Sequence, residues 1–141
     1  MASIGGEEKV AFARILFSNA PVVKWQMATT ADQQSLPVGG EELVGFSVDG
    51  STAIYMDETV KKNFDPKLAE NYSSPLFVEM DKHYRRRWRF TMFKVGENQL
   101  AACNTGMGDG YFASYIGFDS TGAPCRLTTD FNIFEWRQKE Q

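Results

Sequence analysis

The sequence is poor in cysteine and histidine, the side chains that cross-link many small domains or bind metals in them. His83 is the only histidine, and the two cysteines, Cys103 and Cys125, are too few for a disulfide framework. One histidine and two distant cysteines also argue against a zinc site. We therefore expect free thiols and a core that is stabilised by packing, and we predict no cofactor.

Long apolar runs and a strong net charge are also missing. No stretch approaches the roughly 20 residues that cross a bilayer, and residues 1–12 lack the apolar core of a secretion signal. The net charge of −3 disfavours nucleic acid as a partner, because proteins that bind it carry a basic excess. We expect a soluble cytoplasmic protein without a membrane partner.

The chain is long enough for one domain with a substantial core. It has 141 residues, and a domain of this size buries roughly two thirds of the surface that its unfolded chain exposes. No internal repeat or low-complexity tract divides it. We predict a single domain over residues 1–141, in which residues 1–8 are flexible and the polar residues 31–42 form a surface loop.

Aromatic residues make up 13% of the chain, and they suit the half-buried surface of a β-sheet. Residues 9–17 are short, apolar and rich in strand-forming residues. In residues 22–28, the apolar Val23, Trp25 and Met27 alternate with polar residues, which is the period of a sheet with one buried face. Further strands are predicted at residues 100–103, 111–118 and 126–134.

Asp49 and Gly50 lie between two strand-like runs within residues 45–57. A type I′ turn needs positive φ at both of its central positions, which Asp tolerates and Gly adopts freely. We therefore predict a β-hairpin with its tip at Asp49-Gly50.

Two helices are predicted in the middle of the chain. Asp57 is placed to cap a helix over residues 58–64. Ser73 or Ser74, followed by Pro75, fits the start of a second helix. The apolar residues of this second helix have helical spacing and are Leu76, Phe77, Met80 and Tyr84.

Basic residues follow the second helix. Arg85 and Arg86 would lie near its C-terminus, where the helix dipole favours positive charge. From Arg87 the pattern returns to that of a strand. One face of this strand would hold Trp88, Phe90 and Met92. The order of elements predicts an α+β fold, in which a single, mainly antiparallel β-sheet is interrupted mid-chain by two short helices.

Three stretches, in this order, resemble segments of a known family. Residues 106–131 hold a Gly-Asp-Gly, an aromatic strand, a Gly-x-Asp turn and a closing strand that ends in Asp-Phe. Residues 13–28 hold an apolar strand, a turn and a Trp, and residues 44–58 hold a Val-Asp turn. Together they resemble the domain of unknown function 4241 family over residues 9–135. That family has no established activity, so the resemblance implies a fold and a set of positions but no reaction.

The first candidate binding site is the glycine run with Asp109, Gly110 and Tyr111. Glycines let the backbone turn sharply and approach a ligand closely, and Asp109 has a side chain that binds metals or acts as an acid or base. The alternative is turn chemistry at the start of an aromatic strand. No helix follows Gly110, so the run is not a dinucleotide or phosphate loop.

The second candidate site is a set of aspartates. Carboxylates bind calcium or magnesium, and two that lie close together can divide the roles of acid and base. Turns explain Asp49 and Asp119. The remaining weak candidates for metal ligands are Asp57, Asp109 and Asp130, of which Asp57 also fits a helix cap.

The third candidate site is the run of arginines around Trp88. Arginines between aromatic residues hold phosphate backbones and stack bases, or they anchor protein interfaces. The alternative is a solvated helix end with ion pairs. The solvated helix end is favoured for this run. Among the functional interpretations we prefer a protein partner, because the chain is acidic overall, with Arg85, Arg87 and Trp88 as the binding residues. His83, next to this run, is expected on a solvated helix face, although a Cys-His nucleophile pair stays open.

These sites lead to two hypotheses about function. The first is a macromolecule-binding module, such as an immunity-like or accessory protein, that recognises another protein and does no chemistry. The second is a hydrolase or other enzyme that uses Asp57, Asp109 and Asp130, with or without a divalent metal. Binding is preferred over catalysis, because the sequence shows neither a nucleophile with a plausible base nor a dense metal-ligand motif.

Overall fold

The computed structural model describes residues 1–85 and 87–138. In this part of the chain, ten strands form three antiparallel sheets. The strands are β1 (Ala2–Ile4), β2 (Glu7–Lys9), β3 (Phe12–Leu16), β4 (Lys24–Met27), β5 (Phe46–Val48), β6 (Thr52–Tyr55), β7 (Phe90–Val95), β8 (Asn98–Asn104), β9 (Gly110–Phe118) and β10 (Pro124–Asp130). Between β6 and β7 come the helices α1 (Glu58–Asn63) and α2 (Pro75–Lys82), with a 3-10 helix at Pro66–Ala69 between them.

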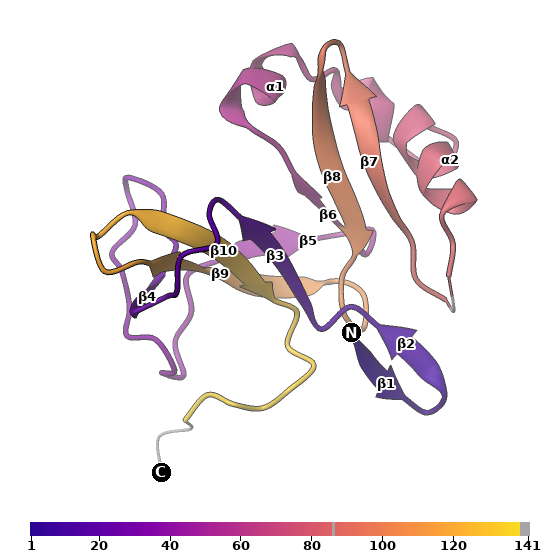
Figure 1. Cartoon of the computed structure of the whole chain (residues 1–141). Helices are drawn as coiled ribbons and strands as arrows, with labels where there is room; N and C mark the ends of the chain where they lie inside the picture. Colours follow the sequence, from indigo (N-terminus) through magenta and orange to yellow (C-terminus); the bar gives the residue numbers. More distant parts are fainter. Residues whose placement is uncertain (86, 139–141) are drawn as a thin grey trace.

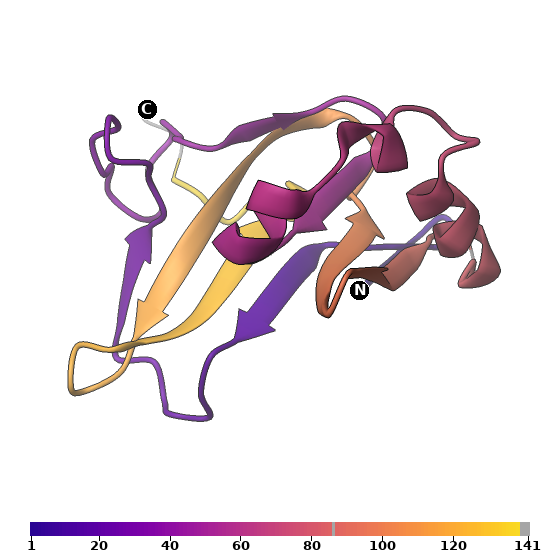
Figure 2. The same ribbon diagram turned by 90° about the horizontal axis from the view of Figure 1, so that it is seen from above.

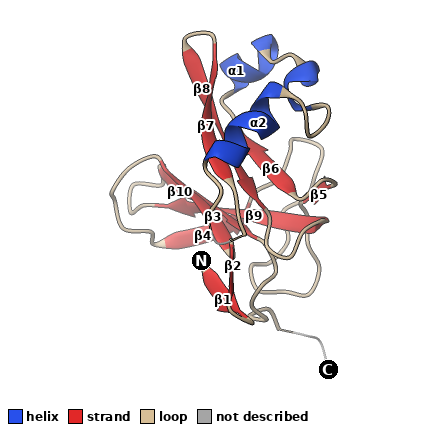
Figure 3. Ribbon diagram, turned by 90° about the vertical axis from the view of Figure 1, so that its right-hand side faces the viewer, coloured by secondary structure: helices blue, strands red, loops and turns tan. Residues whose placement is uncertain are grey.

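The two main sheets are joined at a corner. The larger sheet has the strand order β3-β10-β9-β4, and β5 also pairs with β9, whereas the smaller sheet has the order β6-β8-β7. Figure 1 shows the smaller sheet above the larger one, with the β1–β2 hairpin beside their junction. In Figure 3 the helices lie together on one side of the smaller sheet. The prediction of mainly antiparallel sheet with two short helices mid-chain is confirmed, but the prediction of a single sheet is wrong.

Two of the core clusters meet at the smaller sheet. One lies beneath the helices, where Leu76 and Met80 of α2 are fully buried against Leu100 of β8. The other lies between the two sheets, where Phe112 of β9 packs edge to face on Phe131, with ring centroids 5.1 Å apart. Burial of such side chains stabilises the fold by about 1.5–3 kcal/mol each.

The opposite face of β9 forms a third cluster. Because successive residues of a strand point to opposite faces, Tyr115 lies on the face away from Phe112 and packs with Met27 of β4. The loop of residues 28–45 contributes Leu36 and Leu43 to this cluster. The C-terminal segment lies beside the same loop, where Gln138 N donates to Gly39 O at 2.8 Å (Figure 2).

Both predicted helices are confirmed at their N-termini. Asp57 caps α1, and its carboxylate accepts a hydrogen bond from Thr59 N at 2.8 Å. Ser74 occupies the cap position of α2, and Pro75 is the first residue of that helix. These starts were predictable because capping depends on a few adjacent residues.

The C-terminal end of α2 differs from the prediction. The helix ends at Lys82, so Tyr84 lies outside it and is 57% exposed rather than buried. Lys82 is the basic residue of the last turn, and Arg85 lies beyond the helix. The predicted place of Arg86 lies outside the described residues. A tight turn explains the early end, since Arg85 and Trp88 exchange two backbone hydrogen bonds of 2.8 Å.

The predicted hairpin at Asp49-Gly50 is wrong. β5 pairs with β9 of the larger sheet, whereas β6 pairs with β8 of the smaller sheet. Positive φ occurs at Gly50 (93°) and Ser51 (56°), one residue later than a type I′ turn at Asp49-Gly50 requires. The turn residues 49–51 therefore form a first corner, at which the chain passes from the larger sheet to the smaller one.

Several strands are shifted relative to the sequence patterns. In residues 22–28 only Met27 is buried, and Trp25 is 40% exposed, because β4 is an edge strand. In β7 the buried face begins at Thr91, whereas Met92 is 59% exposed. Residues 1–8 belong mostly to the β1–β2 hairpin, and their flexibility stays a prediction. β10 ends at Asp130, four residues before the predicted end of that strand.

A second corner brings the chain back from the smaller sheet to the larger one through residues 105–109. Asp109 joins the two corners, because its Oδ1 accepts hydrogen bonds from Gly50 N (2.8 Å) and Ser51 N (2.7 Å). Thr105 N also donates to Ser51 O at 3.1 Å. The junction of the sheets is thus fixed by a carboxylate on one crossing and by backbone N–H groups on the other.

We predict that Asp109→Ala lowers the free energy of unfolding by about 1–2 kcal/mol, toward the low end of the cost of losing hydrogen bonds to a charged group, because Asp109 is exposed. Asp109→Asn should cost less, because its amide oxygen still accepts hydrogen bonds. Urea unfolding followed by circular dichroism measures both. Asp49→Ala is the matched control in the same corner, and an equal loss in that variant would contradict the role given to Asp109.

Candidate functional site

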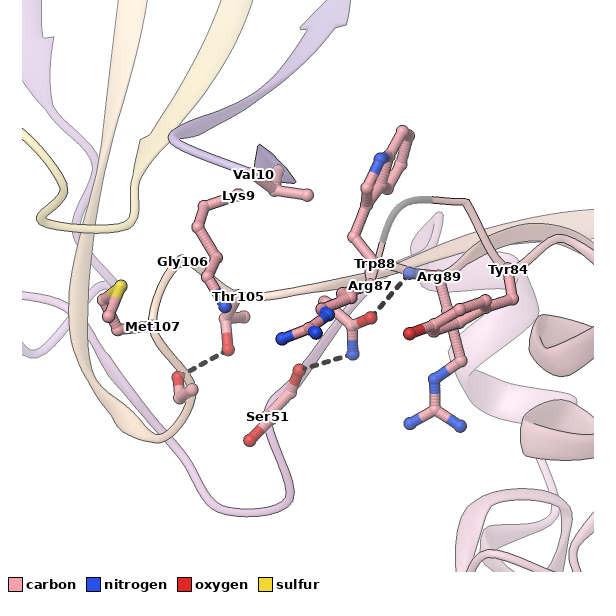
Figure 4. A pocket seen from close by; sticks show the side chains of 12 residues that line it. Lys9, Val10, Ser51, Tyr84, Arg87, Trp88, Arg89, Thr105, Gly106 and Met107 are labelled. Atoms are coloured by element: carbon pink, nitrogen blue, oxygen red, sulfur yellow. Dashed lines mark hydrogen bonds between the residues drawn. The ribbon is translucent and has the colours of Figure 1, made fainter. Parts of the chain in front are cut away.

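Two segments singled out in the sequence line one pocket at the junction of the sheets. The pocket has a volume of about 280 Å³. The turn after α2 contributes Arg87 and Trp88, and the second corner, residues 105–109 (the glycine corner), contributes Gly108. Lys9, at the end of the β1–β2 hairpin, forms a further side (Figure 4). The site therefore combines four stretches that are far apart in sequence, since Ser51 of the other corner also lines it.

Asn104 holds the turn and the corner in place. Its side-chain oxygen accepts a hydrogen bond from Arg89 N at 2.6 Å, and its side-chain nitrogen donates to Ser51 O at 3.2 Å (Figure 4). Its own backbone N donates to Arg89 O at 3.0 Å. Sequence reasoning missed this residue, because an asparagine at the end of a strand carries no local signal of its distant partners.

The basic side chains of the pocket are joined to acids outside it. Lys9 Nζ lies 2.8 Å from Glu7 Oε2, and Arg87 contacts the other oxygen of the same carboxylate. The hydrogen bond from Lys9, followed by the positive charge of Arg87, holds the pKa of Glu7 below its usual value. Arg89 pairs with Asp81 at 2.6 Å. Glu7 thus occupies the position where Lys9 and Arg87 can both contact a carboxylate.

Aromatic and apolar side chains surround these charges. Met107 is 70% exposed and lines the pocket with Tyr84. Trp88 is half-buried and stacks on Phe90 with ring centroids 5.3 Å apart. Arg85 does not line the pocket, and its guanidinium lies 5.9 Å from the centroid of the Phe90 ring.

The predicted residues of the glycine run lie beside the pocket. Asp109 fixes the corner, as described above. Gly110 is required by packing, since a Cβ there would lie 2.7 Å from the Phe112 ring. The Tyr111 hydroxyl accepts a hydrogen bond from Gly45 N at 2.8 Å, which ties β9 to the end of the preceding loop. All three residues thus have structural partners, and none of them lines the pocket.

The three aspartates of the catalytic alternative have separate roles. Asp57 caps α1, and the hydrogen bonds from Thr59 lower its pKa. Asp109 fixes the corner, and Asp130 accepts from Trp136 Nε1 at 2.6 Å near the C-terminus. Among the described residues, no group of three or more acidic, histidine or cysteine side chains could hold a metal ion.

The Cys-His alternative lacks an activated thiol. Burial raises the pKa of Cys103 to about 11, which keeps the thiol protonated at neutral pH. Cys125 is fully buried. His83 Nε2 lies 3.6 Å from Glu79 Oε1 on α2, at the helix end where a solvated histidine was expected.

The sequence comparison identifies a family. A family model described as "Protein of unknown function (DUF4241)" matches residues 2–129. The chain belongs to the DUF4241 family. The match confirms the resemblance carried by the glycine run and the two earlier stretches. No curated protein and no solved structure matches the chain.

The DUF4241 match spans β1 to β10 and therefore includes every segment of the pocket. A description of the family as one of unknown function adds no reaction to the site. In the part of the chain that the structure describes, no helix is long and apolar enough to cross a membrane.

We predict that the pKa of Glu7 rises when either of its basic neighbours is removed, and more in Lys9→Gln than in Arg87→Gln. A carboxyl whose pKa is lowered by folding stabilises the folded state above its unfolded pKa. Glu7 therefore stabilises the folded state at neutral pH, and this stabilisation is lost as the pH falls through its lowered pKa. NMR titration of the Glu7 carboxyl carbon measures the shifts. Arg89→Gln is the control, and the same rise in that variant would contradict the assignment.

Proposed function

We propose that this protein is a binding module that recognises an acidic segment of another protein and does no chemistry. The observation that carries the proposal is the composition of the pocket at the sheet junction. Arg, Trp, Tyr and Met are the residue types enriched in protein interfaces, and Arg87, Trp88, Tyr84 and Met107 lie together there. Two of these, Tyr84 and Met107, are more than half exposed.

The charges of the pocket define the chemistry of the partner. Lys9, Arg87 and Arg89 line it, and none of the lining residues that the structure describes is acidic. Glu7, which lies beside the pocket, already contacts two of these cations. A carboxylate of the partner would take the place of Glu7 and would be desolvated between Lys9 and Arg87. The net charge of −3 opposes approach to the many phosphates of a nucleic acid, whereas one short acidic segment needs only the local cations of the pocket.

The hydroxyls of the pocket support binding over catalysis. Ser51 Oγ donates to Asp109 at 3.2 Å, and Thr105 Oγ1 donates to Gly108 O at 2.7 Å. A hydroxyl nucleophile needs a base within hydrogen-bond reach, and the carbonyl that Thr105 contacts is not a base. Ser51 does contact a carboxylate, but the same oxygen of Asp109 already accepts hydrogen bonds from Gly50 N and Ser51 N, so we assign this contact to the corner. A cytoplasmic role of the immunity or accessory kind fits a small module of this sort.

Affinity capture from cells of the source organism tests the proposal, with wild type, Arg87→Glu and Trp88→Ala used in parallel. We expect a protein that binds wild type with a Kd at least about tenfold lower than that of Arg87→Glu, because central Arg and Trp residues carry most interface energy. Lys94→Glu, the same reversal of charge on β7 outside the pocket, is the matched control and should bind like wild type.

The same experiment can contradict the proposal. If every captured protein binds wild type, Arg87→Glu and Trp88→Ala equally well, the pocket is not the interface. Added glutamate-rich peptide should compete with the partner, since its carboxylates would occupy the same cations. Binding that is unaffected by such a peptide would contradict the acidic partner.

A further inference from the structure

A second cavity, of about 210 Å³, lies on the face of the larger sheet opposite the cluster around Phe112. Four aromatic side chains line it: Phe12 of β3, Trp25 of β4, Tyr115 of β9 and Trp136 of the C-terminal segment. It shares no lining residue with the pocket at Arg87, so the ligand of this cavity is independent of the proposed protein partner.

Strand pairing brings these side chains to one face. Phe12 lies opposite Asp130, and Thr128 lies opposite Tyr115. Residues directly opposite each other share a face of the sheet, and so do residues two apart along a strand. The side chains that form one row on this face are therefore those of Phe12, Asp130, Thr128 and Tyr115. Trp136 closes the row from above, with its ring 5.6 Å from that of Tyr115.

The buried bottom of the cavity holds the carboxylate of Asp130, and aromatic rings surround its open mouth. Asp130 is 2% exposed and Tyr115 is 6% exposed, whereas Phe12, Trp25 and Trp136 are each at least 40% exposed. A ligand that enters between these rings would therefore reach the carboxylate of Asp130.

Asp130 has no cationic partner within the described part of the chain. Its carboxylate accepts hydrogen bonds from Trp136 Nε1 (2.6 Å) and Asn132 N (2.8 Å). The ion pairs of the described residues involve other acids. Arg137, in the same C-terminal segment, donates to the side chain of Asn132 at 3.2 Å. A buried carboxylate without a paired cation is costly, and a bound cation would offset that cost.

Tyr115 provides a second unpartnered group. Its buried hydroxyl has no hydrogen-bond partner among the described residues. Burial raises the pKa of this hydroxyl, so it stays neutral and can donate or accept. Aromatic rings around a carboxylate are the arrangement that binds organic ammonium groups, because the ring faces attract the spread positive charge.

The adjoining cavity defines the other end of the ligand. It shares Phe12, Trp25 and Thr128 with the first cavity, and it is also lined by Arg14 and Arg126. The buried Nε of Arg126 has no hydrogen-bond partner among the described residues, although its Nη2 donates to Ala20 O at 3.2 Å. Two arginines would repel a simple cation, but they would bind a carboxylate carried by the same molecule.

We propose that these joined cavities bind a small zwitterion, with its ammonium group between the aromatic rings above Asp130 and its carboxylate at Arg126. Asp130 and Arg126 are four residues apart on β10, which corresponds to about 13 Å along the strand at about 3.3 Å per residue. The long arginine side chain shortens the gap. A spacer of several methylene groups therefore fits better than the single methylene of glycine betaine.

Isothermal titration tests this site with glycine betaine, γ-butyrobetaine, 6-(trimethylammonio)hexanoate, choline and the neutral 3,3-dimethylbutan-1-ol. We expect the longer zwitterions to bind at least about tenfold more tightly than choline, which lacks the carboxylate. The neutral alcohol, which has the shape of choline without its charge, should not bind. In a Trp88→Phe background, fluorescence reports only on Trp25 and Trp136, so it locates the binding event.

Variants separate the two ends of the ligand. Trp25→Ala, on an exposed edge strand, should weaken binding of the zwitterions at least about fivefold through loss of a ring face. Arg126→Gln should abolish their advantage over choline. Phe17→Ala removes an exposed aromatic residue outside both cavities and should change nothing. Equal binding of the neutral alcohol, or no binding of any charged probe to wild type, would overturn the proposal.

Discussion

The hydrogen bonds of Asp109 to Gly50 and Ser51 are the constraint on which the rest of the structure depends. They hold together the two places where the chain crosses between the sheets. Because both crossings lie side by side, the chain can pass from β8 of the smaller sheet to β9 of the larger one, where Phe112 is buried in the core between the sheets. The pocket at Arg87 exists for the same reason, since Ser51 and Gly108 line it from the two crossings.

Sequence reasoning succeeded where a structure depends on neighbouring residues. The cap at Asp57 and the start of α2 at Pro75 are local, and both were predictable. The role of Asp49-Gly50 was not, because the same turn residues serve a hairpin or a corner, and the choice depends on which distant strand is available. Here β9 and β8 each take one of the two strands that flank the turn.

The candidate site was half predictable for the same physical reason. Arg87 and Trp88 stood out because aromatic residues among arginines are rare and chemically distinctive. Lys9 and Asn104 did not, since an isolated lysine or asparagine acquires its role only when the fold brings it to a distant segment. An aspartate shows the opposite case, in which a residue stood out in the sequence but the fold gave it other neighbours than expected. Asp130 was singled out for metal binding, and its actual neighbours are aromatic rings.

The stretch from Val10 to Phe12 connects the two cavities mechanically. Val10 lines the pocket at the sheet junction, and Phe12 lines the aromatic cavity two residues later. Ala11 between them is 1% exposed, and its carbonyl accepts a hydrogen bond from Phe131 N at 3.0 Å, while Gly106 N donates to Val10 O at 3.1 Å. Neither residue can move without disturbing the glycine corner or the end of β10. The shapes of both cavities therefore depend on the same backbone contacts, although the ligands proposed for them differ in chemistry.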